Sequence, residues 1–453
     1  MSDRGVIVLA VAVWLGALRP LDLPWLVPAV LVCVALVLRR PAALVVSAAL
    51  LSACLAGAAW SGLATVPRGA VVGPAVLVRD PSPVGGAVRV ELRFEGRHAE
   101  AWASGEAATA LRQRLAGEVV AVRGRWRPLS ERSRRWLHPR HVVARIDVSS
   151  VEVVGQGSVA ARAANGLRRT LVRGAGGLPV ERRSLLLGVV LGDDREQPEE
   201  LVDDFRAAGL SHLTAVSGSN LAFVLALAGP VLRRLGLRRR WVVTLCLLAA
   251  FGLLTRWEPS VLRAGAMATL ACTTATIGRP TSRLRLLALA VAGVVLLDPL
   301  LVHAAGFQLS VGATAGIALL ARPLGRRLPE VLAVTLAAQL GVAPVAIPLF
   351  GGLPLASLPA NLLAVPVAAP LTAWGLTGGV VAGVLGPPLD GLLHVPTSLM
   401  TAWLAGVARW GAGLGAGEVA LVLVLGGVVW WVGSGRWSWR WDRTASTSPP
   451  GPS

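Results

Sequence analysis

The sequence predicts an α-helical membrane protein that crosses the bilayer about twelve times and carries a small β domain after its third helix. Hydrophobic residues make up 54% of the 453 residues and charged residues only 15%, too few to cover a soluble protein of this length. Long apolar runs occur at both ends of the chain, whereas residues 70–155 alternate apolar and polar positions. These three observations define the predicted fold class.

Three apolar runs predict transmembrane helices within residues 1–66, at 6–18, 25–38 and 42–60. Arg39 and Arg40 lie between the second and third runs. Because positive residues favour the cytoplasmic side, the third helix should end outside the cell. The first run has no clear small-residue cleavage site, so we interpret it as a retained helix and not a signal peptide.

Residues 67–155 therefore predict an extracytoplasmic β domain. In residues 88–95, four apolar residues alternate with four charged ones, as in a half-buried strand, and similar runs occur at 71–78, 119–126 and 142–154. Four or five strands in this length fit a small barrel such as an OB fold, although alternation alone leaves other small β folds open.

A loop of this domain combines cations with an aromatic ring. Its residues are Arg132, Arg134, Arg135, Trp136 and Arg140. This mixture suits a phosphate backbone and a stacked base, so the loop is a candidate DNA contact. A basic loop resting on anionic lipid is the alternative.

Residues 156–180 predict an amphipathic helix at the membrane surface, with Val159, Leu167 and Leu171 on its apolar face and arginines such as Arg168 on the other.

Residues 181–433 then carry nine apolar runs, at 211–232, 241–255, 259–277, 284–297, 301–320, 331–350, 358–385, 389–410 and 419–432. With nine spans, the later Arg clusters fall on the same side as Arg39 and Arg40, which supports the count. Residues 434–453, basic and then rich in Ser and Pro, predict a disordered cytoplasmic tail.

A long motif in the membrane region resembles the competence domain of the ComEC family. It comprises residues 191–195 and 205–220, and further hallmarks follow in the family's order at 259–264, Asp298-Pro299, 306–310, Gln339-Leu340 and Asn361-Leu362. The resemblance covers residues 185–370 well, and three helices followed by a small β domain also look like this family.

The resemblance implies a channel in the bacterial cytoplasmic membrane that takes up single-stranded DNA during natural transformation, with both chain termini in the cytoplasm. The implied partners are single-stranded DNA, the lipid bilayer, a separate nuclease, a DNA receptor and a cytoplasmic motor. Many family members carry a C-terminal metallo-β-lactamase-like domain, whose metal site needs clustered His and Asp. The six histidines form no such cluster, so we expect no catalytic residues, metal or cofactor here. The absence of lysine also excludes a P-loop ATPase.

Polar residues of the membrane region are the candidates for the DNA path, because a moving polyanion needs a hydrated route with cationic and polar groups. They are Asp193, Arg195, Ser217, Asn220, Arg263, Gln308, Gln339 and Asn361. Each has a structural alternative. Arg263 could pair with Glu258 or reach the interface, the glutamines could bond neighbouring helices, and Asp193 with Arg195 could form a salt-bridged turn.

Two other classes of function are compatible with a polar-lined bundle. A secondary transporter or lipid exporter would need an intramembrane carboxylate, and none falls in mid-membrane within the predicted spans of residues 211–350. An intramembrane hydrolase would need a histidine facing Ser217 from another helix, for which only His303 or His394 could serve.

Overall fold

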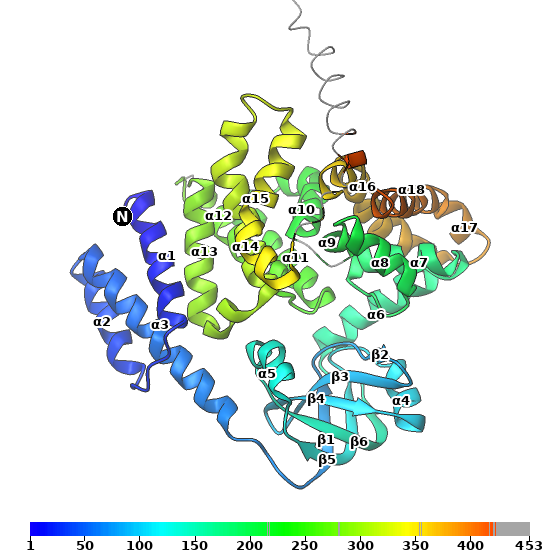
Figure 1. The fold of residues 1–453 in the computed structure, drawn as a ribbon, viewed down its shortest axis with the longest axis horizontal. Helices are drawn as coiled ribbons and strands as arrows, with labels where there is room; N and C mark the ends of the chain where they lie inside the picture. Colours follow the sequence, from blue (N-terminus) through cyan, green and yellow to red (C-terminus); the bar gives the residue numbers. More distant parts are fainter. Residues whose placement is uncertain are drawn as a thin grey trace, which may run out of the picture.

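The computed structural model describes residues 1–419, except 215, 217, 280, 353, 355 and 416, together with residue 422. It is mostly helical, with a separate sheet domain at the bottom of Figure 1. The predicted tail and nearly all of the predicted span at 419–432 lie outside the described residues.

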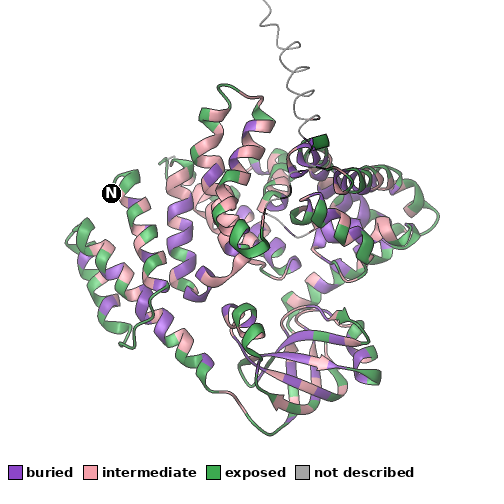
Figure 2. Ribbon diagram, viewed as in Figure 1, coloured by how far each residue is buried: buried purple, intermediate pink, exposed green. Residues whose placement is uncertain are grey.

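The N-terminal region forms the three predicted helices, α1 (Asp3–Ala17), α2 (Leu26–Val37) and α3 (Pro41–Ala64). A Cβ on Gly16 would lie 2.2 Å from the carbonyl oxygen of Ala49, so α1 and α3 approach closely at that glycine. Large apolar side chains of α2, such as Val30 and Val37, are exposed. Much of the ribbon of this helix is accordingly green in Figure 2. Such a surface suits contact with lipid.

The β domain contains six strands. They are β1 (Ala70–Leu77), β2 (Ser82–Val84), β3 (Ala87–Phe94), β4 (Arg97–Ala103), β5 (Val119–Arg127) and β6 (Val142–Gly155). The strand predicted at residues 88–95 exists as β3, and Val88, Val90 and Leu92 are buried in one core, but Glu91, predicted on the exposed face, is buried as well.

The strand pairings link β1, at one end of the sheet, to β3, next to the other end. The order is β1-β5-β6-β4-β3-β2, and β1 also pairs with β3, so the pairings run from β1 through β5, β6, β4 and β3 and return to β1. Only β4 and β6 pair in parallel. The helix α4 (Gly105–Arg112) lies between β4 and β5 in the chain.

The basic segment after β5 is helical, so its prediction as a loop is wrong. It forms α5 (Glu131–Leu137) and the short 3-10 helix η1 (His138–Arg140). The hydroxyl of Ser130 accepts a hydrogen bond from the backbone N–H of Ser133 at 3.2 Å, a local N-cap that starts α5.

The predicted amphipathic helix exists as α6 (Val159–Gly174), but the assignment of Arg168 to its polar surface is wrong. Arg168 is buried and Leu167 is exposed. Arg168 is buried because an acidic residue of the β domain receives it, as described below. Leu171 and Gly174 pack against α16, where a Cβ on Gly174 would lie 2.5 Å from the carbonyl oxygen of Gly379.

The remaining helices form the membrane region. They are α7 (Val180–Leu191), α8 (Glu199–Ala207), α9 (Ser211–Thr214), α10 (Gly218–Arg233), α11 (Leu237–Leu254), α12 (Pro259–Thr276), α13 (Arg283–Leu297), η3 (Pro299–His303), α14 (Ala305–Leu324), α15 (Glu330–Phe350), α16 (Ser357–Leu385), α17 (Leu389–Leu393) and α18 (Val395–Ala412). The run predicted as one span at 389–410 is two helices, which meet at His394.

Four helices of the described residues are long and apolar enough to cross a membrane: α3, α14, α15 and α16. The helices α14 and α15 pack closely, and a Cβ on Gly316 would lie 2.2 Å from the carbonyl oxygen of Ala337. These helices, with a separate sheet domain, indicate a membrane protein.

Candidate functional site at the junction of the β domain and the membrane helices

Arg263 lies near the start of α12 and is only 8% exposed. Its Nε donates a hydrogen bond to the hydroxyl of Ser310 on α14 at 2.8 Å, and its Nη1 lies 3.3 Å from the sulfur of Met267. Within the described residues, no carboxylate forms an ion pair with this guanidinium. The arginine is therefore held by neutral groups among apolar helices.

The first residue of α10 lies close to the guanidinium of Arg263. A Cβ on Gly218 would lie 3.1 Å from Nη2 of Arg263, so this glycine of the family-like motif leaves room for the cation. On α12, the hydroxyl of Ser260 donates to the carbonyl of Val216 at 2.7 Å. The segment that leads into α10 thus meets the helices α12 and α14 at Arg263.

Glu258, which the sequence offered as a partner for Arg263, pairs instead with the β domain. Nη1 of Arg79 lies 2.8 Å from Oε1 of Glu258. The alternative of an Arg263–Glu258 pair is therefore wrong.

The next residue of the β domain, Asp80, is the centre of a buried charge cluster. Its carboxylate accepts from Nη1 of Arg168 at 3.0 Å and also pairs with Arg256, in the turn between α11 and α12. Burial alone would raise the pKa of Asp80, but the charges of Arg256 and Arg168 outweigh it and hold the pKa well below its ordinary value.

The turn that carries Arg256 is strained and tightly held. Arg256 and Trp257 both have positive φ, 61° and 53°, a conformation that residues other than glycine rarely adopt. Nη2 of Arg256 also donates to the carbonyls of Leu191 and Gly192, at 2.9 and 2.8 Å, at the end of α7. The cluster therefore ties the β domain, α6, α7 and α12 together.

Asp193 and Arg195, two candidates for the DNA path, belong to the edge of this cluster. Arg195 donates to both carboxylate oxygens of Asp193, at 2.7 and 2.6 Å, and Arg168 lies 3.8 Å from Asp193. Burial would raise the pKa of Asp193, but the hydrogen bond from Arg195 prevails and lowers it. This geometry is the salt-bridged turn that the sequence left as an alternative.

The candidates of the basic segment divide into two groups. Arg132, Arg135 and Trp136 are exposed on α5, whereas Arg134 pairs with Glu131 of the same helix at 3.2 Å. Arg140 points to the sheet and pairs with Glu91.

Beyond Arg140, the next residue, His141, contacts the membrane region. Its Nε2 lies 3.0 Å from Asp298, at the start of η3, and the hydrogen bond with Asp298 raises the pKa of His141. The β domain therefore meets the membrane helices again at η3.

The other described intramembrane candidates bond different partners. Asn220 of α10 donates to the carbonyl of Val189 at 2.8 Å, and Gln308 donates to the carbonyl of Val302 at 2.6 Å. Gln339 of α15 bonds the hydroxyl of Ser357 on α16, and Asn361 is buried one turn further on. Ser217 lies outside the described residues.

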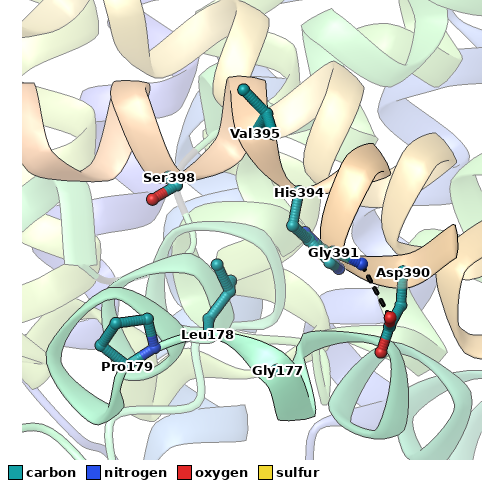
Figure 3. Close-up of a pocket in the computed structure, with 8 residues that line it drawn as sticks. All are labelled: Gly177, Leu178, Pro179, Asp390, Gly391, His394, Val395 and Ser398. Atoms are coloured by element: carbon teal, nitrogen blue, oxygen red, sulfur yellow. Dashed lines mark hydrogen bonds between the residues drawn. The ribbon is translucent and has the colours of Figure 1, made fainter. Parts of the chain in front are cut away.

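A small cavity of about 200 Å³ lies elsewhere, between the segment that precedes α7 and the α17–α18 corner (Figure 3). Asp390, His394 and Ser398 line it, and of these only His394 was considered from the sequence, as a possible hydrolase partner of Ser217. In the described part of the chain, no three His, Cys, Asp or Glu side chains are grouped so that they could hold a metal ion.

Sequence reasoning missed Arg79, Asp80, Arg168, Arg256 and Glu258 as members of the junction. The order of the charged residues in the two segments was the signal that could have revealed these pairs. Arg79 is opposite in charge to Glu258, and the adjacent Asp80 is opposite in charge to Arg256. These are the two pairs that form.

Comparison with known proteins identifies the membrane region. A family model described as "Competence protein" matches residues 189–443. The chain is 28% identical over 229 residues to the uncharacterized protein YcaI of Escherichia coli (strain K12), and 27% identical over 213 residues to ComE operon protein 3 of Bacillus subtilis (strain 168).

Each alignment covers 46% of this chain, and the chain spans 30% of YcaI and 27% of ComE operon protein 3. No solved structure matches. The family match includes the segment before α10, Arg263 and Ser310, and it extends over more than half of the chain. The chain therefore belongs to the competence protein family.

Proposed function

We propose that the chain is a channel through which single-stranded DNA crosses the bacterial cytoplasmic membrane during competence. Membership of the competence family and the similarity to ComE operon protein 3 support DNA uptake. The proposed channel has about twelve spans, of which α3, α14, α15 and α16 have the best support from length and composition. A separate nuclease, a DNA receptor and a cytoplasmic motor are the proposed partners.

The observation that carries this proposal is the environment of Arg263. A charged group inside a membrane helix costs on the order of 2.5–3.5 kcal/mol if it is near the middle, and such residues usually serve a pathway or a ligand. Arg263 has a hydroxyl and a thioether as its described partners, which leave its charge unneutralised. A passing phosphate would supply the missing negative charge in a geometry that suits a guanidinium.

We further propose that the β domain is OB-like and receives the strand. The ring of pairings through β1, β5, β6, β4 and β3, with α4 between β4 and β5, supports this fold. The exposed α5 follows β5, and Arg132, Arg135 and Trp136 offer cations and a ring for a phosphate and a base.

We place the β domain outside the cell and both chain termini in the cytoplasm. The turn between α14 and α15, which carries Arg326 and Arg327, lies at the opposite end of the molecule from the β domain in Figure 1. Arginines mark cytoplasmic turns, so this arrangement supports the assignment.

The test is DNA uptake by a strain in which the gene is deleted and then restored. Labelled duplex DNA should stay outside the deletion strain, and one labelled strand should enter cells that express the wild-type chain. Equal entry in both strains would refute the proposal.

A further inference from the structure

We infer that Arg79 and Arg140 form a phosphate-binding site at the entrance of the channel, and that Glu258 occupies the Arg79 side of this site until DNA arrives. Arrival of the strand would replace the carboxylate of Glu258 with a phosphate on Arg79, while the buried Glu91 stays between the two guanidinium groups. The inference rests on the proposed function, because it names the place where the strand passes from the β domain to α12.

The four side chains form an alternating row. Glu258, at the start of α12, pairs with Arg79 at 2.8 Å, and Arg79 reaches Glu91 of β3 at 3.3 Å through its Nε. Glu91 in turn pairs with Arg140 at the end of η1. The row joins the β domain to the membrane helices and has no net charge.

Solvent reaches Arg79, Arg140 and Glu258 of this row, whereas the side chain of Glu91 is only 7% exposed. The side chains of Arg79 and Arg140 are each 35% exposed and that of Glu258 is 27% exposed. The adjacent pair of Asp80 and Arg168 is 4% and 3% exposed. A strand can therefore reach Arg79 and Arg140, while the buried pair keeps the β domain attached.

A phosphate can take the place of a carboxylate on a guanidinium group. A guanidinium binds a carboxylate and a phosphate through the same planar fork of N–H donors. A partly exposed ion pair contributes little to the stability of the fold, so a phosphate can replace Glu258 easily. The Nε of Arg140 is buried and has no hydrogen-bond partner in the described part of the chain, so Glu91 leaves one donor of this guanidinium unsatisfied.

The site lies between the two other candidate DNA contacts. Arg140 follows α5 directly, where Arg135 and Trp136 are exposed, and Glu258 precedes Arg263 by five residues on α12. A strand held on α5 would meet Arg140 and Arg79 before it reaches Arg263. When Glu258 is released from Arg79, its carboxylate becomes free beside the entrance.

Binding of a fluorescent 20-nucleotide oligothymidine to the purified full chain tests the inference. Glu258→Gln removes a competing carboxylate, so we expect about fivefold tighter binding than for the wild type. Arg79→Gln should weaken binding about fivefold and make the slope of log K against log salt shallower by about 0.7, the loss of one phosphate contact.

Glu196→Gln is the matched control. It changes the net charge by the same amount and frees Arg183, its partner at 2.7 Å, outside the row. Its binding should equal that of the wild type. Glu258 makes no side-chain capping hydrogen bond to α12, so Gln should leave the fold intact, and Arg79→Gln decides the question independently.

The outcomes separate the inference from the proposed function. If the wild type binds but Glu258→Gln and Glu196→Gln bind alike, or Arg79→Gln keeps the wild-type salt slope, the inference is overturned and the channel proposal stands. If the wild type does not bind the oligonucleotide, both are overturned.

Discussion

Asp80 of the β domain is ion-paired with Arg256, the residue that begins the strained turn before α12. The residue before Asp80, Arg79, pairs with Glu258 two positions after Arg256. Two adjacent residues of the β domain thus hold both sides of one turn in the membrane region. This attachment positions the β domain at the start of the helix that carries Arg263.

Asp80→Asn should strongly destabilise the protein, because Arg168 and Arg256 would remain buried without their carboxylate. Breaking a buried ion pair costs about 3–5 kcal/mol. Thermal unfolding of the purified protein, with abundance in membranes, measures the effect. Asp147→Asn, which removes exposed pairs with Arg127 and Arg145, is the control and should cost at most about 1 kcal/mol. Equal unfolding temperatures for the two variants would contradict the described cluster.

Stability should also depend on pH through His141. Asp298 raises the pKa of His141 in the folded state, so the pair contributes fully below the unfolded pKa of about 6.5 and its contribution is lost as pH rises through the folded value. We expect the difference in unfolding temperature between the wild type and His141→Asn to be larger at pH 5.5 than at pH 8.5. A difference that is constant or grows with pH would show that the pair is not formed.

Trp136→Ala should weaken binding of single-stranded DNA about tenfold, because one stacked base contributes about 1–3 kcal/mol. Trp136 is 52% exposed on α5, so its removal should not unfold the domain. Arg134→Ala is the control, since Glu131 already engages that guanidinium, and it should have a small effect. Fluorescence anisotropy at one fixed salt concentration gives both affinities. Unchanged binding in Trp136→Ala would remove α5 from the DNA path.

The exposed residue Ser104, which precedes α4, reports on the side of the membrane that the β domain occupies. In a variant without the four native cysteines, Ser104→Cys should react with a membrane-impermeant maleimide in intact cells. Arg326→Cys, in the turn between α14 and α15, serves as the inward control and should react only after lysis. The reverse pattern would invert the proposed topology.

Local patterns in the sequence predicted the elements well. The alternation at Val88, Val90 and Leu92 identified β3, and the apolar runs identified the helices, because both signals depend on neighbours in the chain. Composition did not reveal the break at His394, where α17 ends and α18 begins, because an apolar run is equally compatible with one helix or two.

Local sequence patterns could not predict which distant residues pair with each other. Glu258 lies five residues from Arg263, yet its partner is Arg79, 179 residues away, and the described partner of Arg263 is Ser310 on another helix. Arg168 was assigned to a polar surface because helical periodicity shows which residues share a face but not what covers that face. Asp80, 88 residues away, is what makes its burial possible.

DNA uptake by cells that carry Arg263→Ala or Arg263→Gln tests the central claim most directly, provided that protein abundance is measured in the same cells. Arg285→Gln, which removes an exposed pair with Asp3 at the end of another membrane helix, is the control. The account predicts near-normal abundance and sharply reduced uptake for both Arg263 variants, with normal uptake for the control. Normal uptake in Arg263→Ala cells at normal abundance would contradict it.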